Sequence, residues 1–418
     1  MTVLHRGLRL GMTLLASVMA PACGPELPPG SILEVGEQES AALGLEAGSR
    51  LPPLNREALR QAIAGLPDAE VTGALVRVEG AEGSEGRWLG ASGVADVRTG
   101  APVRADARFR IGSMTKVFTA TVVLQLAAER RVDLDRPVQE YLPRLLPAGV
   151  YAPITVRQLL NHTHGLPGVP VPQKDPDWFF VNRFRRYSPR ELIALALPEG
   201  PRFAPGTQQD YGNIGYIVAG LLIEQVTGRP YGDAVRDRIL RPLRLGDTFV
   251  PGNLVTIPGP HARGYEEIQA EAGVCPAGAI VYQARCLVDV TEASQSVPWA
   301  AGEMVSSTAD LDRFLVALFQ GRLLPHAQRE ELFTVPDVPN VDGGRAIYSA
   351  GLSRIQVGGL TLWGKSGDRH GYNNGMGATR DLRRRLVYSV NTLRMGQDRP
   401  DIAARIVAAA MGGLQAAP

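Results

Sequence analysis

Alternating hydrophobic and polar positions indicate β-strands near both ends of the chain. Three segments before residue 112 have this pattern: Val71–Val78, Trp88–Ala95 and Ala107–Ile111. Three more lie in the last third: Ala350–Val357, Thr361–Lys365 and Arg385–Asn391. Strands at the two ends, with helices between them, predict one antiparallel sheet built from the N- and C-terminal segments.

Helical patterns fill most of the chain between these strands. Thr115–Glu129 is apolar on nearly every side, which is typical of a buried central helix. Other helices are expected after the cap residue Thr155, up to Gly165, and at Ile214–Thr227, Ser307–Gln320 and Ile402–Met411. The fold class is therefore predicted as α+β. The α/β part spans about 51–125 and 300–415, the helical insertion about 126–299, and a cleft is expected where they meet.

Composition narrows the class of protein. The 418 residues carry a formal net charge of +2 and are 44% hydrophobic, which suits a globular protein of one large or two apposed domains. No basic run is interleaved with aromatic residues, so nucleic acid is not an expected partner.

The first residues have the pattern of an export signal. A short basic region is followed by the apolar run Leu10–Ala20, which is too short to span a bilayer, and by the small residues Ala20-Pro21-Ala22. Cys23 comes next and is a candidate for lipidation, while plain secretion stays open. We therefore expect an export signal or lipobox at 1–23 and a tether at 24–50, with membrane contact only through a lipid anchor.

The two remaining cysteines and a histidine pair are candidates for structural or metal sites. Cys275 and Cys286 form either a local disulfide, as an oxidising compartment would favour, or two free thiols. His162 and His164 have the spacing of a metal-binding pair, but no third ligand is suggested. We expect no metal and no organic cofactor.

The sequence Ser113-Met114-Thr115-Lys116 opens the central helix. Residues three apart share a helical face, so the Lys116 amine is expected beside the Ser113 hydroxyl. A serine needs a base to become a nucleophile, and a buried lysine can serve. Free backbone N–H groups at a helix start can hold an oxyanion. A serine and a lysine at this spacing are common by chance. They indicate an active site only if other catalytic motifs accompany them.

Two later motifs supply such partners. Tyr211-Gly212-Asn213 precedes an apolar helix, where the tyrosine hydroxyl could relay a proton and the asparagine amide could hold a substrate carbonyl and the Lys116 amine. Lys365-Ser366-Gly367 is predicted to end a strand whose edge can pair with an extended peptide and bind a carboxylate. Gly367 removes a side chain where the substrate backbone must pass.

With these three motifs in this order, the chain resembles the beta-lactamase and penicillin-binding serine hydrolases. The Y-x-N form resembles the branch of class C beta-lactamases and secreted D-alanyl-D-alanine carboxypeptidases. The likeness covers roughly residues 55–395 and includes these stretches: Phe109–Ser113, Leu159–Pro167, Ala204–Gly206, Ile257–Tyr265 and Gln295–Leu311.

The resemblance implies a role for each matching residue. Ser113 would be the nucleophile, Lys116 and Tyr211 the proton-handling pair, and Lys365 an electrostatic aid. Asn213 would hold the substrate, and the backbone N–H groups of Ser113 and Asp368 would form the oxyanion hole. Ser366 and Gly367 would contact substrate at the strand edge. Trp299 resembles an aromatic residue of the cleft wall, with a place in the core as the alternative.

Two positions depart from the family pattern. Serine replaces the usual threonine at Ser366, which keeps the hydroxyl. Asp368 stands where Ser or Thr is usual, and its carboxylate is expected to repel a substrate carboxylate unless Arg369 or Lys365 offsets it.

The expected activity is hydrolysis through an acyl-enzyme, of the D-alanyl-D-alanine carboxypeptidase type. A peptidoglycan stem peptide would be the donor and beta-lactams would be acylating ligands. An esterase or a beta-lactamase of the same family is the alternative. A non-catalytic sensor of muropeptides or beta-lactams is a further alternative of a different class.

Overall fold

The computed structural model describes residues 51–80, 86–270, 273–357, 359–395 and 401–412. The expected export signal, tether and lipidation site at Cys23 lie outside these residues. Among the described helices, none combines the length and the apolar character needed to cross a membrane.

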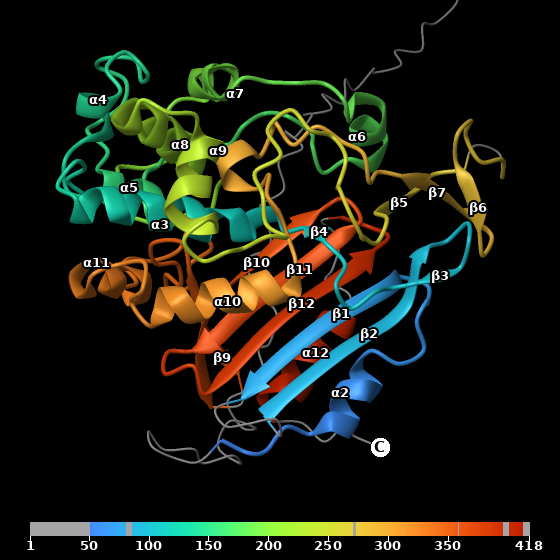
Figure 1. Ribbon diagram of the computed structural model, residues 1–418. Coiled ribbons are helices and arrows are strands. Elements are labelled where there is room, and N and C mark those ends of the chain that lie inside the picture. The colour runs from blue at the N-terminus through green and yellow to red at the C-terminus, as the bar shows by residue number, and fades with distance from the viewer. Residues whose placement is uncertain (1–50, 81–85, 271–272, 358, 396–400, 413–418) are drawn as a thin grey trace, which may run out of the picture.

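The centre of the fold is a seven-stranded antiparallel sheet in the order β3-β2-β1-β12-β11-β10-β9 (Figure 1). Its strands are β1 (Val71–Gly80), β2 (Arg87–Asp96), β3 (Ala101–Pro102), β9 (Ser353–Val357), β10 (Leu360–Arg369), β11 (Tyr372–Thr379) and β12 (Arg384–Thr392). The first long strand, β1, pairs with the last, β12, from Val71 opposite Thr392 to Gly80 opposite Arg384. The α+β fold, with a sheet built from both ends of the chain, is confirmed.

Helices cover both faces of this sheet (Figure 1). On one face α2 (Arg56–Ala62) and α12 (Asp401–Met411) enclose a small apolar core that includes Leu59, Val76 and Ile406. The other face carries the larger core beneath α10 (Thr308–Phe319) and the central helix α3 (Thr115–Ala128). The buried central helix is as predicted, because eleven of its residues are buried.

The part inserted between the strands is largely helical. Besides α3 it contains α4 (Val138–Tyr141), α5 (Val156–Leu160), α6 (Pro176–Asn182), α7 (Pro189–Ala196), α8 (Ile214–Thr227) and α9 (Tyr231–Val235). Short 3₁₀ and π turns join them: η3 (Gly112–Met114), η4 (Leu197–Glu199), η5 (Arg236–Leu240) and η6 (Trp299–Ala301). The helix α11 (His326–Glu330) and the turn η7 (Glu331–Phe333) follow α10. Thr155 caps α5 in a capping box with Gln158, as its position before the apolar run predicts.

Several boundaries differ from the sequence-based expectation. The strand expected at 107–111 is reduced to β4 (Phe109–Arg110), which pairs with β8 (Val305–Ser306), and α5 ends at Leu160 instead of continuing to Gly165. The insertion also contains a three-stranded sheet: β5 (Tyr265–Ile268), β6 (Ile280–Tyr282) and β7 (Arg285–Asp289).

The strand β11 was not predicted, because glycines and two consecutive asparagines interrupt its apolar pattern. One of these asparagines has a structural role. Asn374 is fully buried, and its Nδ2 donates to Arg110 O and Gly367 O, each at 2.9 Å. The buried amide of Asn374 thus links β10 to Arg110 of β4, just before the turn that leads into α3.

Candidate active site

Ser113 lies in the turn that leads from β4 into α3. The turn η3 contains Ser113, which is half-buried between the buried residues Gly112 and Met114. Gly112 has a φ of +53°, and a Cβ there would stand 2.6 Å from Asp368 O and 2.7 Å from Asp368 N. Glycine therefore allows the turn to lie directly against the backbone of β10.

Lys116 contacts the serine from the first turn of α3. Its Nζ lies 3.0 Å from Ser113 Oγ, 2.7 Å from Asn213 Oδ1 and 3.0 Å from Ala301 O. Lys116 is 1% exposed. The three acceptors therefore provide the hydrogen bonds that the buried amine can no longer make to water. The structure thus brings the first and second motifs together, as the sequence predicts.

Tyr211 lies between the two lysines of the site. Its ring centroid is 4.8 Å from Lys116 Nζ and 4.6 Å from Lys365 Nζ. Asn213 is the residue before α8, yet its side chain makes no cap bond to that helix and accepts from Lys116 instead. All three motifs therefore meet around Tyr211 and Ser113.

The third motif lies within β10 and does not end it, because the strand continues to Arg369. The neighbouring strand β9 pairs with β10 only over Leu360–Gly364, before the motif begins. A Cβ at Gly367 would stand 2.0 Å from Ile111 O and 2.9 Å from Ser113 N. Gly367 is thus the position where β10 touches the serine turn, and any side chain would push them apart.

The side chain of Asp368 lies on the face of β10 opposite to that of Gly367, and its repulsion of a substrate carboxylate stays a prediction. Successive side chains of a strand point to opposite faces, and Gly367 faces the serine turn. Asp368 Oδ1 accepts a 2.5 Å hydrogen bond from Asn373 Nδ2, the residue opposite it on β11. The backbone of Asp368 lies against Gly112, next to the serine.

The side chain of Ser366 lies on the same face of β10 as that of Asp368, because side chains alternate along a strand. It is half-buried and lines a small cavity of about 50 Å³ with Tyr388 and Met411, between the sheet and α12. The contact of its hydroxyl with substrate stays a prediction.

Trp299 packs against the helical part of the molecule. It belongs to η6, and its ring lies 5.3 Å from that of Tyr231. A Cβ at Gly220 of α8 would stand 2.6 Å from the Trp299 ring. The structure therefore places Trp299 against α8 and α9, and its place in the wall of the catalytic cleft stays a prediction.

Comparisons with known proteins agree with this arrangement. A family model described as beta-lactamase matches residues 59–411. The chain belongs to the beta-lactamase family.

Two solved structures match most of this chain over nearly their whole length. A D-stereospecific amidohydrolase from Streptomyces is 33% identical with a TM-score of 0.71, over 85% of this chain and 98% of that one. The D-amino acid amidase of Ochrobactrum anthropi is 28% identical with a TM-score of 0.69, over 84% and 98%. Similarity to these proteins identifies this beta-lactamase family member as a serine hydrolase.

A curated relative with a longer chain is penicillin-binding protein 4* of Bacillus subtilis. It is 26% identical over 325 residues, which is 74% of this chain and 66% of that protein. The beta-lactamase family member thus spans slightly less than two thirds of this relative, and 39% of an Amycolatopsis lactamdurans penicillin-binding protein.

Aromatic residues that the motifs do not include surround Tyr211. The ring of His162 lies 4.6 Å from that of Tyr211, and the ring of Tyr348 lies 4.9 Å from it. Burial, followed by the charge of Lys116, holds the pKa of His162 well below its usual value, so its ring is neutral. Tyr348 lies in no motif, and no sequence signal could have assigned it to the site.

The two histidines considered as metal ligands have structural contacts. His164 Nδ1 accepts from Leu166 N at 2.9 Å, and His162 Nδ1 accepts from Gly212 N at 3.4 Å. Burial lowers the pKa of His164 to about 4. Within the described part of the chain, no group of three or more His, Cys, Asp or Glu residues could hold a metal ion.

Cys275 and Cys286 form a disulfide with a Cα–Cα distance of 5.3 Å. Cys286 lies on β7 and packs in a small apolar cluster with Phe179 of α6 and Val288. The disulfide thus links β7 to the segment that precedes β6, within the part of the chain that forms the three-stranded sheet.

Proposed function

We propose that this protein hydrolyses amide bonds that follow a D-amino-acid residue, through an acyl-enzyme on Ser113, with D-alanyl-D-alanine-terminated peptides as its preferred substrates. The observation that carries the proposal is the contact of Ser113 Oγ with Lys116 Nζ at 3.0 Å, with Asn213 and Tyr211 around the lysine. The preference for D-residues rests on the relatives named for D-stereospecific hydrolysis and for penicillin binding.

The reaction follows from the positions of these groups. Ser113 Oγ attacks the carbonyl carbon, and its proton passes to the pair formed by Lys116 and Tyr211. The oxyanion is held by the backbone N–H groups of Ser113 and Asp368, on the two sides of the contact between η3 and β10. The pair returns the proton to the leaving amine, and the C–N bond breaks. Water then adds to the ester carbonyl, giving up a proton to the same pair, and Ser113 leaves with a proton.

Lys365 is proposed to bind the carboxylate of a substrate. It is 3% exposed, and it lies on the face of β10 that meets Ser113. The Asp368 carboxylate is held by Asn373 on the opposite face of β10, which keeps its charge away from a terminal carboxylate that meets the lysine. A peptidoglycan stem peptide fits this description, and a beta-lactam is the corresponding acylating ligand.

Hydrolysis of D-amino-acid amides is the second candidate. It is supported by the two amide-cleaving relatives, whose chains this protein covers almost completely. These substrates have no terminal carboxylate, so Lys365 would contribute little to their binding. An esterase, a beta-lactamase and a non-catalytic sensor are further outcomes that the same experiment separates.

Intact-protein mass spectrometry after brief exposure to benzylpenicillin tests the nucleophile. We expect an adduct of one penicilloyl group on the wild type and on Ser92→Ala, a control serine on β2, but none on Ser113→Ala. Drug consumption without an adduct would indicate a beta-lactamase. An unmodified protein with intact drug would leave an esterase, an amidase or a sensor.

A substrate panel then tests the finer assignment. A peptide ending in D-Ala-D-Ala should be cleaved faster than its D-Ala-L-Ala form and faster than D-phenylalanine amide. The reverse order for the amide would establish the second candidate. No turnover of any peptide, amide or ester would indicate the sensor.

Location outside the cytoplasm is a separate part of the proposal. The segment 1–23 supports export, and the disulfide between Cys275 and Cys286 is consistent with an oxidising compartment. Membrane fractionation of full-length protein should show a lipid-dependent anchor that Cys23→Ser removes. A soluble exported wild type would establish plain secretion.

A further inference from the structure

A second cavity lies on the far side of η6 from Lys116. Its volume is about 730 Å³, and its walls come from α8, α9, η5, the segment 244–252 and η6. Aromatic and apolar side chains form much of the lining, including Tyr231, Phe249, Val250 and Trp299. None of the residues of the three motifs is among its lining residues.

Glu303 is a buried carboxyl group in the wall of this cavity. It is 1% exposed; its Oε2 accepts from Gly252 N at 3.2 Å, and its Oε1 has no hydrogen-bond partner among the described residues. Burial raises the pKa of Glu303 to about 8, and the charge of Glu224 adds to the rise. A carboxyl group in this state lacks the partner that would make its ionisation favourable.

Glu224 lies in the same wall. It is half-buried, and its Oε1 accepts from Tyr231 N at 2.9 Å. The Tyr231 ring lies 5.3 Å from that of Trp299. Two carboxyl groups beside aromatic rings are the features that recognise an ammonium group, since a cation is attracted by both.

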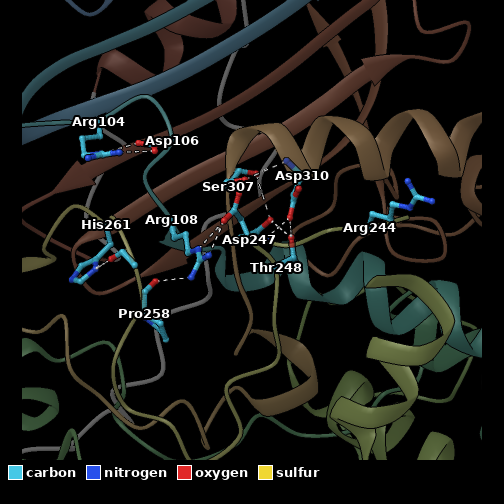
Figure 2. Close-up of polar contacts among 12 residues, drawn as sticks. Arg104, Asp106, Arg108, Arg244, Asp247, Thr248, Pro258, His261, Ser307 and Asp310 are labelled. Carbon is cyan, nitrogen blue, oxygen red and sulfur yellow. Dashed lines mark hydrogen bonds and ion pairs between the residues drawn. The ribbon is translucent and has the colours of Figure 1, made fainter. Parts of the chain in front are cut away.

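Two arginines of the lining are paired with nearby aspartates. Arg236 contacts Asp233 at 2.5 Å and Asp237 at 3.3 Å, and Arg241 contacts Asp237 at 3.0 Å. Arg244 is exposed, and Figure 2 shows its guanidinium directed away from Asp247 and Asp310. Two of the three lining arginines are therefore already paired with aspartates, which limits how far the basic groups offset the charge that Glu224 and Glu303 would carry.

The outer wall of the cavity is held in place by polar contacts (Figure 2). Asp310 Oδ2 accepts from Asp247 N at 2.8 Å and from Thr248 Oγ1 at 2.9 Å. Arg108 donates to Asp247 Oδ1 and to Pro258 O, each at 2.8 Å. These bonds hold Asp247 and Thr248 against α10 and against Arg108, the residue before β4.

We propose that this cavity binds an organic cation, an ammonium group on an apolar body, with the charge beside Glu303 and Glu224 and the apolar body against Trp299, Tyr231 and Phe249. Binding of the cation ionises Glu303 and releases its proton. Lys365 gives the active site the opposite preference, because its charge repels a cation.

Isothermal titration calorimetry with benzyltrimethylammonium tests this site, with benzyl alcohol as the uncharged comparison. The probe carries a permanent charge, so only the protein titrates. We expect its affinity to rise about fivefold or more between pH about 6.5 and 8.5, by linkage to the Glu303 proton. At the lower pH, titrations in two buffers of different ionisation enthalpy should show proton release on binding.

Three variants locate the probe. Glu303→Gln should bind it about tenfold more weakly with no pH dependence, and Glu224→Gln should bind it about threefold more weakly. Glu199→Gln, an exposed carboxyl outside the cavity, should match the wild type. Circular dichroism checks the fold of each variant, and Glu224→Gln remains informative if Glu303→Gln does not fold.

Three results would overturn the proposal. The first is an absence of probe binding by the folded wild type. The second is equal affinity for benzyl alcohol and the cation, which would show an apolar cavity without charge recognition. The third is an unchanged affinity and pH slope in Glu303→Gln or Glu224→Gln.

Discussion

The two sides of η6 differ in how their polar groups are satisfied. On one side Lys116 Nζ has three acceptors, and one of them is Ala301 O of the turn itself. On the other side Glu303 keeps an oxygen without a partner among the described residues. The first arrangement holds its reacting groups in place before substrate arrives, whereas the second leaves its interaction to a ligand. Only the first has a sequence motif.

The largest effect is expected for a replacement of Lys116, on the catalytic side of η6. Lys116→Ala should lower the acylation rate about a thousandfold or more, because Ser113 loses the group that takes its proton. Thr119→Val removes the other side-chain bond from α3 to η6, in which Thr119 Oγ1 donates to Ala300 O at 2.7 Å. Stopped-flow acylation by benzylpenicillin should show a change of less than about tenfold for this control. Equal losses would mean that Lys116 acts mainly by holding η6.

The next largest effect is expected where β10 touches the serine turn. Gly367→Ala should reduce kcat/KM about a hundredfold, because its Cβ would displace Ile111 O and Ser113 N. Gly377→Ala is the matched control on β11, where the nearest atom would stand 3.5 Å away. Steady-state kinetics on the two variants would contradict the contact if they behaved alike.

Glu303, on the second side of η6, should make the stability of the protein depend on pH. The pKa of Glu303 is raised to about 8 by burial, so the folded state holds a proton that the unfolded state releases near pH 4.5. The free energy of unfolding should therefore fall as pH rises from about 5 to 8, by up to about 1.4 kcal/mol per unit, and level off above. Urea titrations at several pH values should show a smaller slope for Glu303→Gln. An identical slope would mean that Glu303 is ionised in the folded protein.

The smallest effect is expected at Asp368. Asp368→Asn should change kcat/KM by less than about threefold for both carboxylate and amide substrates, because the side chain is held by Asn373 off the serine face. A selective gain for the D-Ala-D-Ala peptide would restore the repulsion that the sequence suggested.

Sequence patterns predicted the parts of the site that depend on local spacing. Ser113 and Lys116 are adjacent along one helix entry, and Asn213 precedes an apolar helix. The motif was expected to end the strand, whereas β10 continues to Arg369, and alternation along the strand decides which face the Asp368 side chain occupies. Glu303 and Tyr348 acquire their surroundings only from segments far apart in the chain, which no local pattern reports.

The pairing of β1 with β12 has a consequence for biosynthesis. Thr72 and Asn391 are hydrogen-bonded across 319 positions of sequence, and Arg384 Nη2 donates to Pro52 O near the start of the domain. During translation β1 therefore leaves the ribosome well before β12 has been synthesised. Until then one edge of β1 has no strand to pair with. Chains that end early, by truncation or stalled translation, would keep that edge exposed. For such chains, aggregation during synthesis is a greater hazard than loss of catalytic residues.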